Sequence, residues 1–586
     1  ERSDMRKLNR MELWLRALAP ALALLAASCA TAPPRWTPET VAPPASLDAA
    51  MEKVAPPVEG RADEVKLPLP AEEAKVLDLT RDGAIATALS NNLSLEVAEY
   101  GPPIAATFVR EARSAFDPML TGTVSRGQDI SQVGGITGIM LGGFGSTSAF
   151  PSLSSMANAT PEQALVGVLS GLTALAAQPT IEPFLKTDTA NATTTIANFL
   201  PTGTQVFLTG DANWSRTNYT DDEYKGTWSA GVTQALLRGA GPGVNLVALR
   251  QAKNQAARSQ HVLRGNVLDT VSQVDRQYWS PVLAQELIKI REFGVQIAEE
   301  QYKVSEDLAE VGRIANGVLM SAKAEVATRR ADLVDAQAML RQQTLEMVRL
   351  LNPDVMTPDN VSFKTVDPPE VVEVEVHPDQ SAQLAELYRP ELAQARLDLA
   401  NQDLEVVRTK NGLLPRLDAF AAYGRSSLGD SWSGAREFLD EDEYDNYRFG
   451  VQFEVPILNR GERARYTRAK LGREQAETAI ENLQQMLDTQ VHQAAIEVER
   501  QWQRIAATKE AVAASEEAMR VQQDRFSVGL STNLDVLQVQ RDLIFTQVNE
   551  VTARVSYIQA LVGLYAAEGT LLERRGVIFD DRYKDK

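Results

Sequence analysis

The longest regular pattern in the chain is an apolar repeat inside an uninterrupted helix-forming stretch. Residues 473–528 contain neither Gly nor Pro, and Gly529 follows directly. Apolar residues recur there at spacings of three and four that give an eleven-residue period, at Ile480, Leu483, Leu487, Val491, Ala494, Val498, Trp502 and Ile505. Such a period keeps packed helices nearly straight, and a helix of roughly 80 Å cannot bury its stripe in a compact domain. The pattern predicts long helices packed side by side, from this chain or from copies of it.

The chain also repeats itself. Residues 84–118 correspond to 381–415, and each segment predicts an amphipathic helix that ends before a proline. The motif Asp-x-x-x-Val-Gly-x-x-x-Asn occurs at 307–316 and again at 524–533. Its Gly closes a long helix where positive φ is needed, and its Asn is expected to cap the next helix. The sequence therefore predicts two helical hairpins with equivalent tips.

These matches set the expected domain boundaries. A first repeat spans 78–352, a link spans 353–380, a second repeat spans 381–570, and a C-terminal tail spans 571–586. The distance between matching positions falls from 297 to 217 along the chain, so the first repeat holds about eighty additional residues. We assign them to an extracellular insertion at 127–203 that contains a short helix at 161–178. An additional strand at 201–215 is then expected to run into the outer part of the barrel. In the first long helix, Pro281 should produce a kink or start a new helix at Ser280.

Alternating patterns follow the helices. In 447–455 every odd position is large and apolar, and in 224–236 the apolar and polar residues again separate onto two faces. With partners at 119–126 and 416–424, these segments suit about four tilted membrane strands, although a soluble two-faced sheet gives the same alternation. Because four strands cannot close a barrel and open edges are not tolerated in lipid, copies must combine. A trimer would supply about twelve strands.

The N-terminus has the features of an export signal. A basic segment with Arg6, Lys7 and Arg10 precedes a short apolar core, and Cys29 follows small residues. Residues 1–29 are similar to a bacterial lipoprotein signal that ends at a lipidated Cys29; a plain signal peptide is the alternative. Residues 30–77 are rich in Pro and Ala, which predicts an extended tether.

Composition narrows the possible chemistry. The formal net charge of −19 argues against a nucleic-acid surface. The three histidines (His261, His377 and His492) lie far apart, and Cys29 is the only cysteine, so the sequence predicts no metal site, no cofactor and no enzyme. An acidic run at 440–445 is expected to be solvated, with divalent-cation binding as the alternative.

Together these features resemble the TolC-type outer-membrane channels, also called outer-membrane factors. The resemblance covers about residues 78–570, through the tandem repeat, the helix-Pro-strand junctions at Pro118 and Pro415, and the Val-Gly tips. It implies a mainly α fold with membrane β: a homotrimer with a twelve-stranded outer-membrane barrel above a long periplasmic tunnel of helices. It also implies docking on a periplasmic adaptor protein and an inner-membrane pump, whose substrates pass through a passive duct.

The resemblance also implies site residues. An acidic ring should close the pore just after the second tip, where Asp535 stands in the first acidic position and Gln538 in the second. An Asp favoured by the helix dipole is the alternative for Asp535. The residues that match adaptor-contact tips are Val311, Gly312, Arg313, Asn316, Val528, Gly529, Leu530 and Asn533.

The functional hypothesis is an exit duct, for small-molecule efflux or for type I protein secretion. The alternative from another class is a non-conducting coiled-coil lipoprotein with a structural role in the envelope.

Overall fold

The computed structural model describes residues 75–132, 184–218, 220–312, 314–352, 361–365, 367–369, 371–438 and 445–577, all within one compact unit, Glu73–Lys586. The expected signal peptide, Cys29, most of the tether, the helix at 161–178, Arg313 and residues 440–444 of the acidic run lie outside the described residues. Within the described residues, no helix combines the length and the apolar character needed to cross a membrane.

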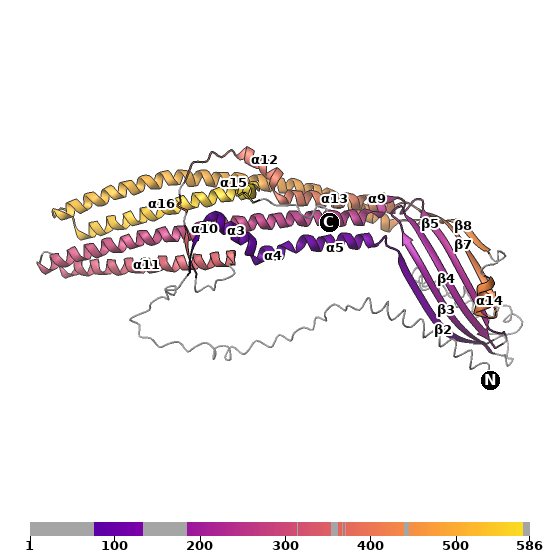
Figure 1. Ribbon diagram of the computed structural model, residues 1–586. Helices are drawn as coiled ribbons and strands as arrows, with labels where there is room; N and C mark the ends of the chain where they lie inside the picture. The colour runs from indigo at the N-terminus through magenta and orange to yellow at the C-terminus, as the bar shows by residue number, and fades with distance from the viewer. Residues whose placement is uncertain are drawn as a thin grey trace, which may run out of the picture. The chain divides into compact units, whose positions relative to one another are not determined.

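Two long helical hairpins lie side by side (Figure 1). The first consists of α10 (Val247–Glu310) and α11 (Asn316–Leu351), and the second of α15 (Arg460–Ser527) and α16 (Asn533–Glu568). Helices α11 and α16 each have 36 residues and begin 217 positions apart, which confirms the repeat. Helix α10 continues through Pro281, so no new helix starts at Ser280.

The shorter helices repeat as well. Helix α3 (Arg81–Asn91) and helix α12 (Pro378–Tyr388) each have 11 residues and begin 297 positions apart. Helices α4 (Leu93–Glu99) and α5 (Gly101–Ser114) then lead to the sheet, as does α13 (Pro390–Gly412) in the second copy. The described residues also form the short helices α9 (Pro242–Asn245), α14 (Trp432–Phe438) and α17 (Leu571–Arg574). Strands β1 (Lys75–Leu79) and β6 (Val361–Thr365) form a parallel pair that joins the first repeat to the link.

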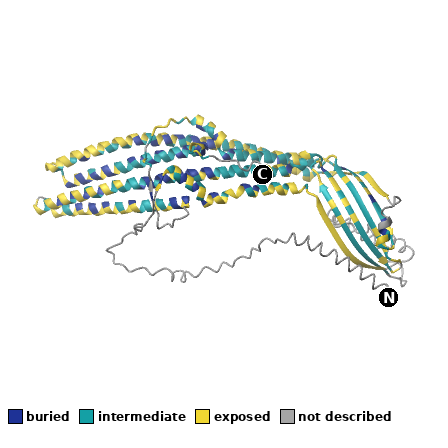
Figure 2. Cartoon of the chain, in the orientation of Figure 1, coloured by how far each residue is buried: buried dark blue, intermediate teal, exposed yellow. Residues whose placement is uncertain are grey.

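The helical core is largest around the middle of α10. Tyr278, Val271 and Val274 are fully buried there against α3, α11, α16 and α17. A second core joins α12, α15 and α16 around Val491 and Tyr557. Figure 2 shows buried residues gathered along this middle region and exposed residues toward the hairpin tips.

The larger sheet of the described residues has six antiparallel strands, whereas four membrane strands and one additional strand at 201–215 were expected. They are β2 (Met119–Gln132), β3 (Phe184–Phe199), β4 (Thr204–Thr217), β5 (Glu223–Ala235), β7 (Arg416–Gly429) and β8 (Asp445–Glu454), in the order β2-β3-β4-β5-β7-β8. The expected insertion at 127–203 is therefore wrong at both ends, because 127–132 and 184–199 are hydrogen-bonded strands. The expected strand at 201–215 is confirmed as β4.

Comparison of the two copies identifies the additional strands. Strands β2 and β7 each have 14 residues and begin 297 positions apart, so each is the first sheet strand of its copy. Strands β5 and β8 are the last sheet strands of the two copies. A contact recurs between the last two strands of each copy: a Cβ on Gly231 would lie 2.5 Å from the Phe207 ring, and a Cβ on Gly450 would lie 2.8 Å from the Phe420 ring. The first copy thus contains two additional strands, and β4 occupies beside β5 the place that β7 has beside β8.

The turn between β3 and β4 is hydrogen-bonded to the segment that connects β5 with α10, which includes α9. Gly203 has φ +83°, a left-handed conformation that favours glycine. Asn245 of α9 donates to the carbonyls of Pro201 and Gly239, and Gly241 N donates to the Thr202 carbonyl. The additional strands are therefore built into the end of the sheet that adjoins the helices.

The residues expected as a C-terminal tail begin with a packed segment. Leu571 and Leu572 are buried in the main core, and Arg575 Nε donates to Asp275 Oδ2 at 2.7 Å. Asp275 is fully buried in α10. Burial raises the pKa of this carboxyl, whereas the Arg575 guanidinium opposes the rise.

We predict that Arg575→Ala lowers the melting temperature measured by circular dichroism. An unpaired buried carboxylate costs about 3–5 kcal/mol. Without Arg575 the pKa of Asp275 rises further, and a raised carboxyl pKa destabilises the fold increasingly as pH rises. The decrease in melting temperature should therefore become smaller as the pH is lowered. A decrease that does not change with pH would contradict this explanation. Arg264→Ala is the control, because its pair with Glu573 is more exposed and should contribute less than about 1 kcal/mol.

Candidate functional site

The two hairpin tips have matching backbones. Gly312 and Gly529 adopt φ +72° and +79°, which confirms that each Gly closes its long helix in a left-handed conformation. Val311 and Val528 precede them and are 69% and 68% exposed. Each tip therefore presents an apolar side chain to solvent.

The predicted Asn caps are wrong. Asn316 and Asn533 are the first residues of α11 and α16, and the N-caps are Ala315 and Thr532. Thr532 Oγ1 accepts from Asp535 N at 3.3 Å, and Asp535 Oδ2 accepts from Thr532 N at 3.0 Å, forming a capping box. Because Ala315 has no side-chain acceptor, only the second tip is fixed in this way.

Asn533 makes a contact between the two hairpins instead of capping α16. It is buried, and its Oδ1 accepts from Gln301 Nε2 of α10. Its counterpart Asn316 is exposed. The start of α16 is therefore attached to the first hairpin, whereas the start of α11 lacks the equivalent amide contact.

Asp535 lies on the exposed face of α16. Hydrogen bonds from the Thr532 hydroxyl and backbone lower the pKa of Asp535, so the carboxylate stays charged at neutral pH. Gln538, Asp542 and Phe545 follow at exposed positions spaced by three or four residues, on the same helical face. The sequence analysis overlooked Asp542, although its place two turns after Asp535 was a readable signal.

An ionic cluster joins the two hairpins above the tips. Glu325 of α11 is buried and lies 2.6 Å from Arg329 Nη2 and 2.7 Å from Arg541 Nη2 of α16. Burial raises the pKa of Glu325, but the two guanidinium groups outweigh burial and lower it. The sequence analysis missed this cluster, because only the Glu325–Arg329 pair has helical spacing and Arg541 is 216 positions away.

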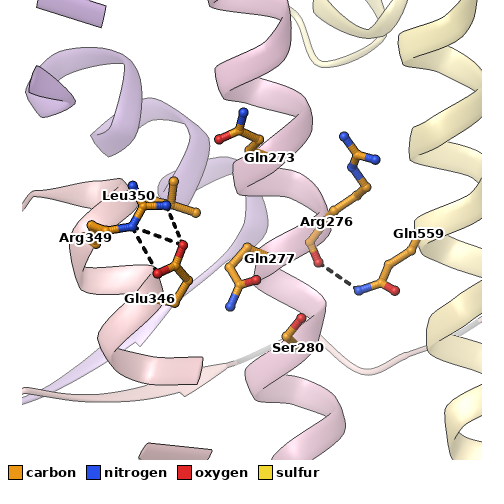
Figure 3. A pocket seen from close by; sticks show the side chains of 8 residues that line it. All are labelled: Gln273, Arg276, Gln277, Ser280, Glu346, Arg349, Leu350 and Gln559. Carbon is orange, nitrogen blue, oxygen red and sulfur yellow. Dashed lines mark hydrogen bonds and ion pairs between the residues drawn. The ribbon is translucent and has the colours of Figure 1, made fainter. Parts of the chain in front are cut away.

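A polar pocket lies between α10, α11 and α16 (Figure 3). Its lining residues are Gln273, Arg276, Gln277, Ser280, Glu346, Arg349, Leu350 and Gln559. Glu346 and Arg349 pair with each other, and Gln559 Nε2 donates to the Arg276 carbonyl at 3.1 Å. Since this lining contains no His or Cys and its carboxylate is already paired, it offers no nucleophile activated by a base.

The sheet has two chemically distinct faces. Register places one apolar set on a shared face: Val206, Leu208, Trp214, Tyr224, Trp228, Val232, Tyr447, Phe449, Val451 and Phe453. The opposite face carries mostly hydroxyl and amide groups, including Thr121, Thr123, Thr189, Asn191, Thr193, Thr195, Thr209, Asn213, Thr227 and Ser229. This confirms the predicted alternation and suits a sheet between lipid and water.

The model of the outer membrane efflux protein family matches residues 185–353 and 382–570, which is more than half of the chain. The chain belongs to this family. It is 25% identical over 306 residues to the proteases secretion protein PrtF of Dickeya chrysanthemi, spanning 51% of this chain and just under two thirds (64%) of that relative. It is 24% identical to the outer membrane efflux protein BepC of Brucella suis, over 62% of this chain and 77% of the relative. The solved structure of CusC has the same fold, with TM-score 0.59 and 16% identity over 84% of this chain and 92% of CusC.

We predict that Arg541→Ala accelerates amide hydrogen exchange at the start of α11 and α16. The change removes one partner of the buried Glu325 carboxylate, at a cost of about 1–3 kcal/mol. Since the pKa of Glu325 is lowered in the fold, the contribution should be present at neutral pH and vanish as pH falls through that lowered pKa. Arg520→Ala is the control, because its pair with Glu517 is exposed on both sides. Equal exchange in the two variants would contradict a linking role for Arg541.

Proposed function

We propose that this chain is the protomer of an outer-membrane exit duct, through which substrates delivered by a pump pass without chemical change. The observation that carries the proposal is a sheet with one apolar and one hydroxyl-lined face that continues into long paired helices. The family model and the fold shared with CusC support it. The named relatives include a protease secretion protein and an efflux protein, so both substrate classes stay open.

Copies of the chain are needed to complete the duct, and we propose a homotrimer. Among the residues that the structure describes, the outer edges of β2 and β8 have no partner strand. Helices α4 and α5, with Tyr100 between them, carry an exposed apolar stripe that leads toward β2: Val97, Tyr100, Ile104 and Phe108. This stripe supports packing against another copy, where α15 exposes Leu471 and Ile496.

The remaining partners follow from the same proposal. A periplasmic adaptor would contact the exposed tips at Val311, Val528 and Leu530, and an inner-membrane pump would deliver substrate through it. Outer-membrane lipid would cover the apolar face of the sheet, and an N-terminal lipid on Cys29 would add an anchor.

Asp535 would contribute a carboxylate ring to the pore. In a trimer, three copies of an exposed, charged Asp535 attract cations if they face the axis, and Asp542 on the same face would add a second ring about 10 Å further along. Gln538, between them, supplies no charge.

The test is single-channel recording of the purified chain in planar bilayers. We expect discrete openings whose cation preference falls in Asp535→Asn and falls further when Asp542→Asn is added. Thr532→Ala is the control, because it weakens the capping box and keeps the carboxylate. Openings whose preference ignores Asp535 would discard the ring and keep the duct. A folded chain without conductance, alone or with an adaptor, would favour the structural envelope lipoprotein.

A further inference from the structure

We propose that the wall of this duct contains eighteen strands, six from each copy, closed by β8 of one copy pairing with β2 of the next. The inference rests on the proposed function, because it takes the trimer from there. It departs from the twelve strands that the family resemblance implied. The partner at each sheet edge is a second copy of this chain.

The additional strands belong to the wall itself. Strand β3 pairs with β2 along Met119–Gln132 and with β4 along Gln205–Thr217, so both its edges are occupied. Strand β4 is likewise paired on both sides, by β3 and β5. A hairpin folded into the lumen or against the outside of a four-stranded wall would lack these continuous ladders.

The side chains of β3 and β4 follow the same two-faced pattern as the rest of the sheet. Ile196 and Leu208 are opposite each other on the apolar face, and Thr195 and Thr209 are opposite each other on the polar face. The two hydroxyls lie 3.0 Å apart. The additional strands thus have the alternation that lipid on one side and water on the other require.

Apolar side chains on the two outer strands, β2 and β8, are largely exposed. On β2, Leu120 and Val124 are 62% and 76% exposed, and on β8, Phe449 and Val451 are 77% and 63% exposed. Their unpaired backbone groups would cost several kcal/mol each in lipid. Strand β2 runs away from the helices and β8 runs back toward them, so the two edges of neighbouring copies meet antiparallel.

The internal repeat specifies the register of this junction. Strands β5 and β7 already form the equivalent junction between the two repeats, with Val232 opposite Ala421. Val451 corresponds to Val232 through the matching Gly450 and Gly231, and Val124 corresponds to Ala421 through the matching starts of β2 and β7. The repeat therefore places Val451 opposite Val124 of the partner subunit.

Eighteen strands change the size of the opening. Barrel diameter grows roughly linearly with strand number, so the wall would be roughly 1.5 times as wide as one of twelve strands. The helices available to each copy are still the two repeats described above, so the duct would widen at the membrane relative to the helical part.

Cysteine cross-linking tests the junction in the full-length chain. Val124→Cys combined with Val451→Cys should give covalent dimers and trimers on mild oxidation, because directly opposite residues have Cα atoms about 4.5–5.5 Å apart, within disulfide range. Val124→Cys with Tyr447→Cys is the control, since Tyr447 lies four residues along β8 and should not reach. Cys29 is present in every variant, so its own reactivity appears equally in the control.

A second pair of cysteines tests the alternative, a wall of twelve strands. If β2 and β3 lay outside a twelve-stranded wall, β4 would form the edge, and Leu208→Cys would cross-link with Val451→Cys instead. That result, or an intact trimer in which neither pair cross-links, would overturn the eighteen-stranded wall and leave the duct in place. Native mass spectrometry of the unsubstituted chain separates the two failures: without a trimer, the trimeric assembly of the proposed function fails as well. Counting eighteen wall strands in a cryo-EM map of the trimer would support the inference without any substitution.

Discussion

The proposed duct depends on one constraint: every backbone donor and acceptor of a sheet that spans a membrane needs a partner, because the bilayer core supplies no water. In the described sheet, the four inner strands have a partner strand on both sides. Strands β2 and β8 each have a partner on one side only. The side chains of these two strands are correspondingly more exposed than those of β4 and β5 between them. In the proposed duct, assembly of copies is therefore a condition of stability in the membrane, and closure of the sheet would set the arrangement of the helices that follow it.

Much of the helical architecture could be predicted from the sequence, because long helices have a strong periodic signal and Gly marks their ends. The offset of 217 that the Val-Gly motifs suggested is the offset between the starts of α11 and α16. The offset of 297 is likewise that between α3 and α12 and between β2 and β7. Repeated local signals of this kind constrain each other, which makes their joint interpretation more secure than any single motif.

The features that sequence reasoning missed have weak or non-local signals. Strand β3 contains five Thr residues and few large apolar ones, so its alternation is difficult to see until β2 and β4 pair with it. The repeated Asn suggested the wrong cap at the second tip: the hydroxyl of Thr532, one position earlier, and Asp535, three positions after Thr532, form the stronger capping signal. The contact between Glu325 and Arg541 depends on how the two hairpins pack, which no spacing within one helix encodes.

The two hairpin tips share a backbone turn but differ in how the next helix begins. Both keep the left-handed Gly and the exposed Val, which the backbone turn and an apolar contact surface require. Only the second tip adds the capping box and the buried Asn533–Gln301 contact, and these fix the helix start that carries Asp535. A charge that must occupy a defined position in a pore benefits from such a rigid support, whereas a surface that adapts to a partner does not need it. In the proposed duct, Thr532 would thus let the second tip hold a charge in place in addition to the contact surface that both tips offer, whereas Ala315 leaves the first tip with the contact surface.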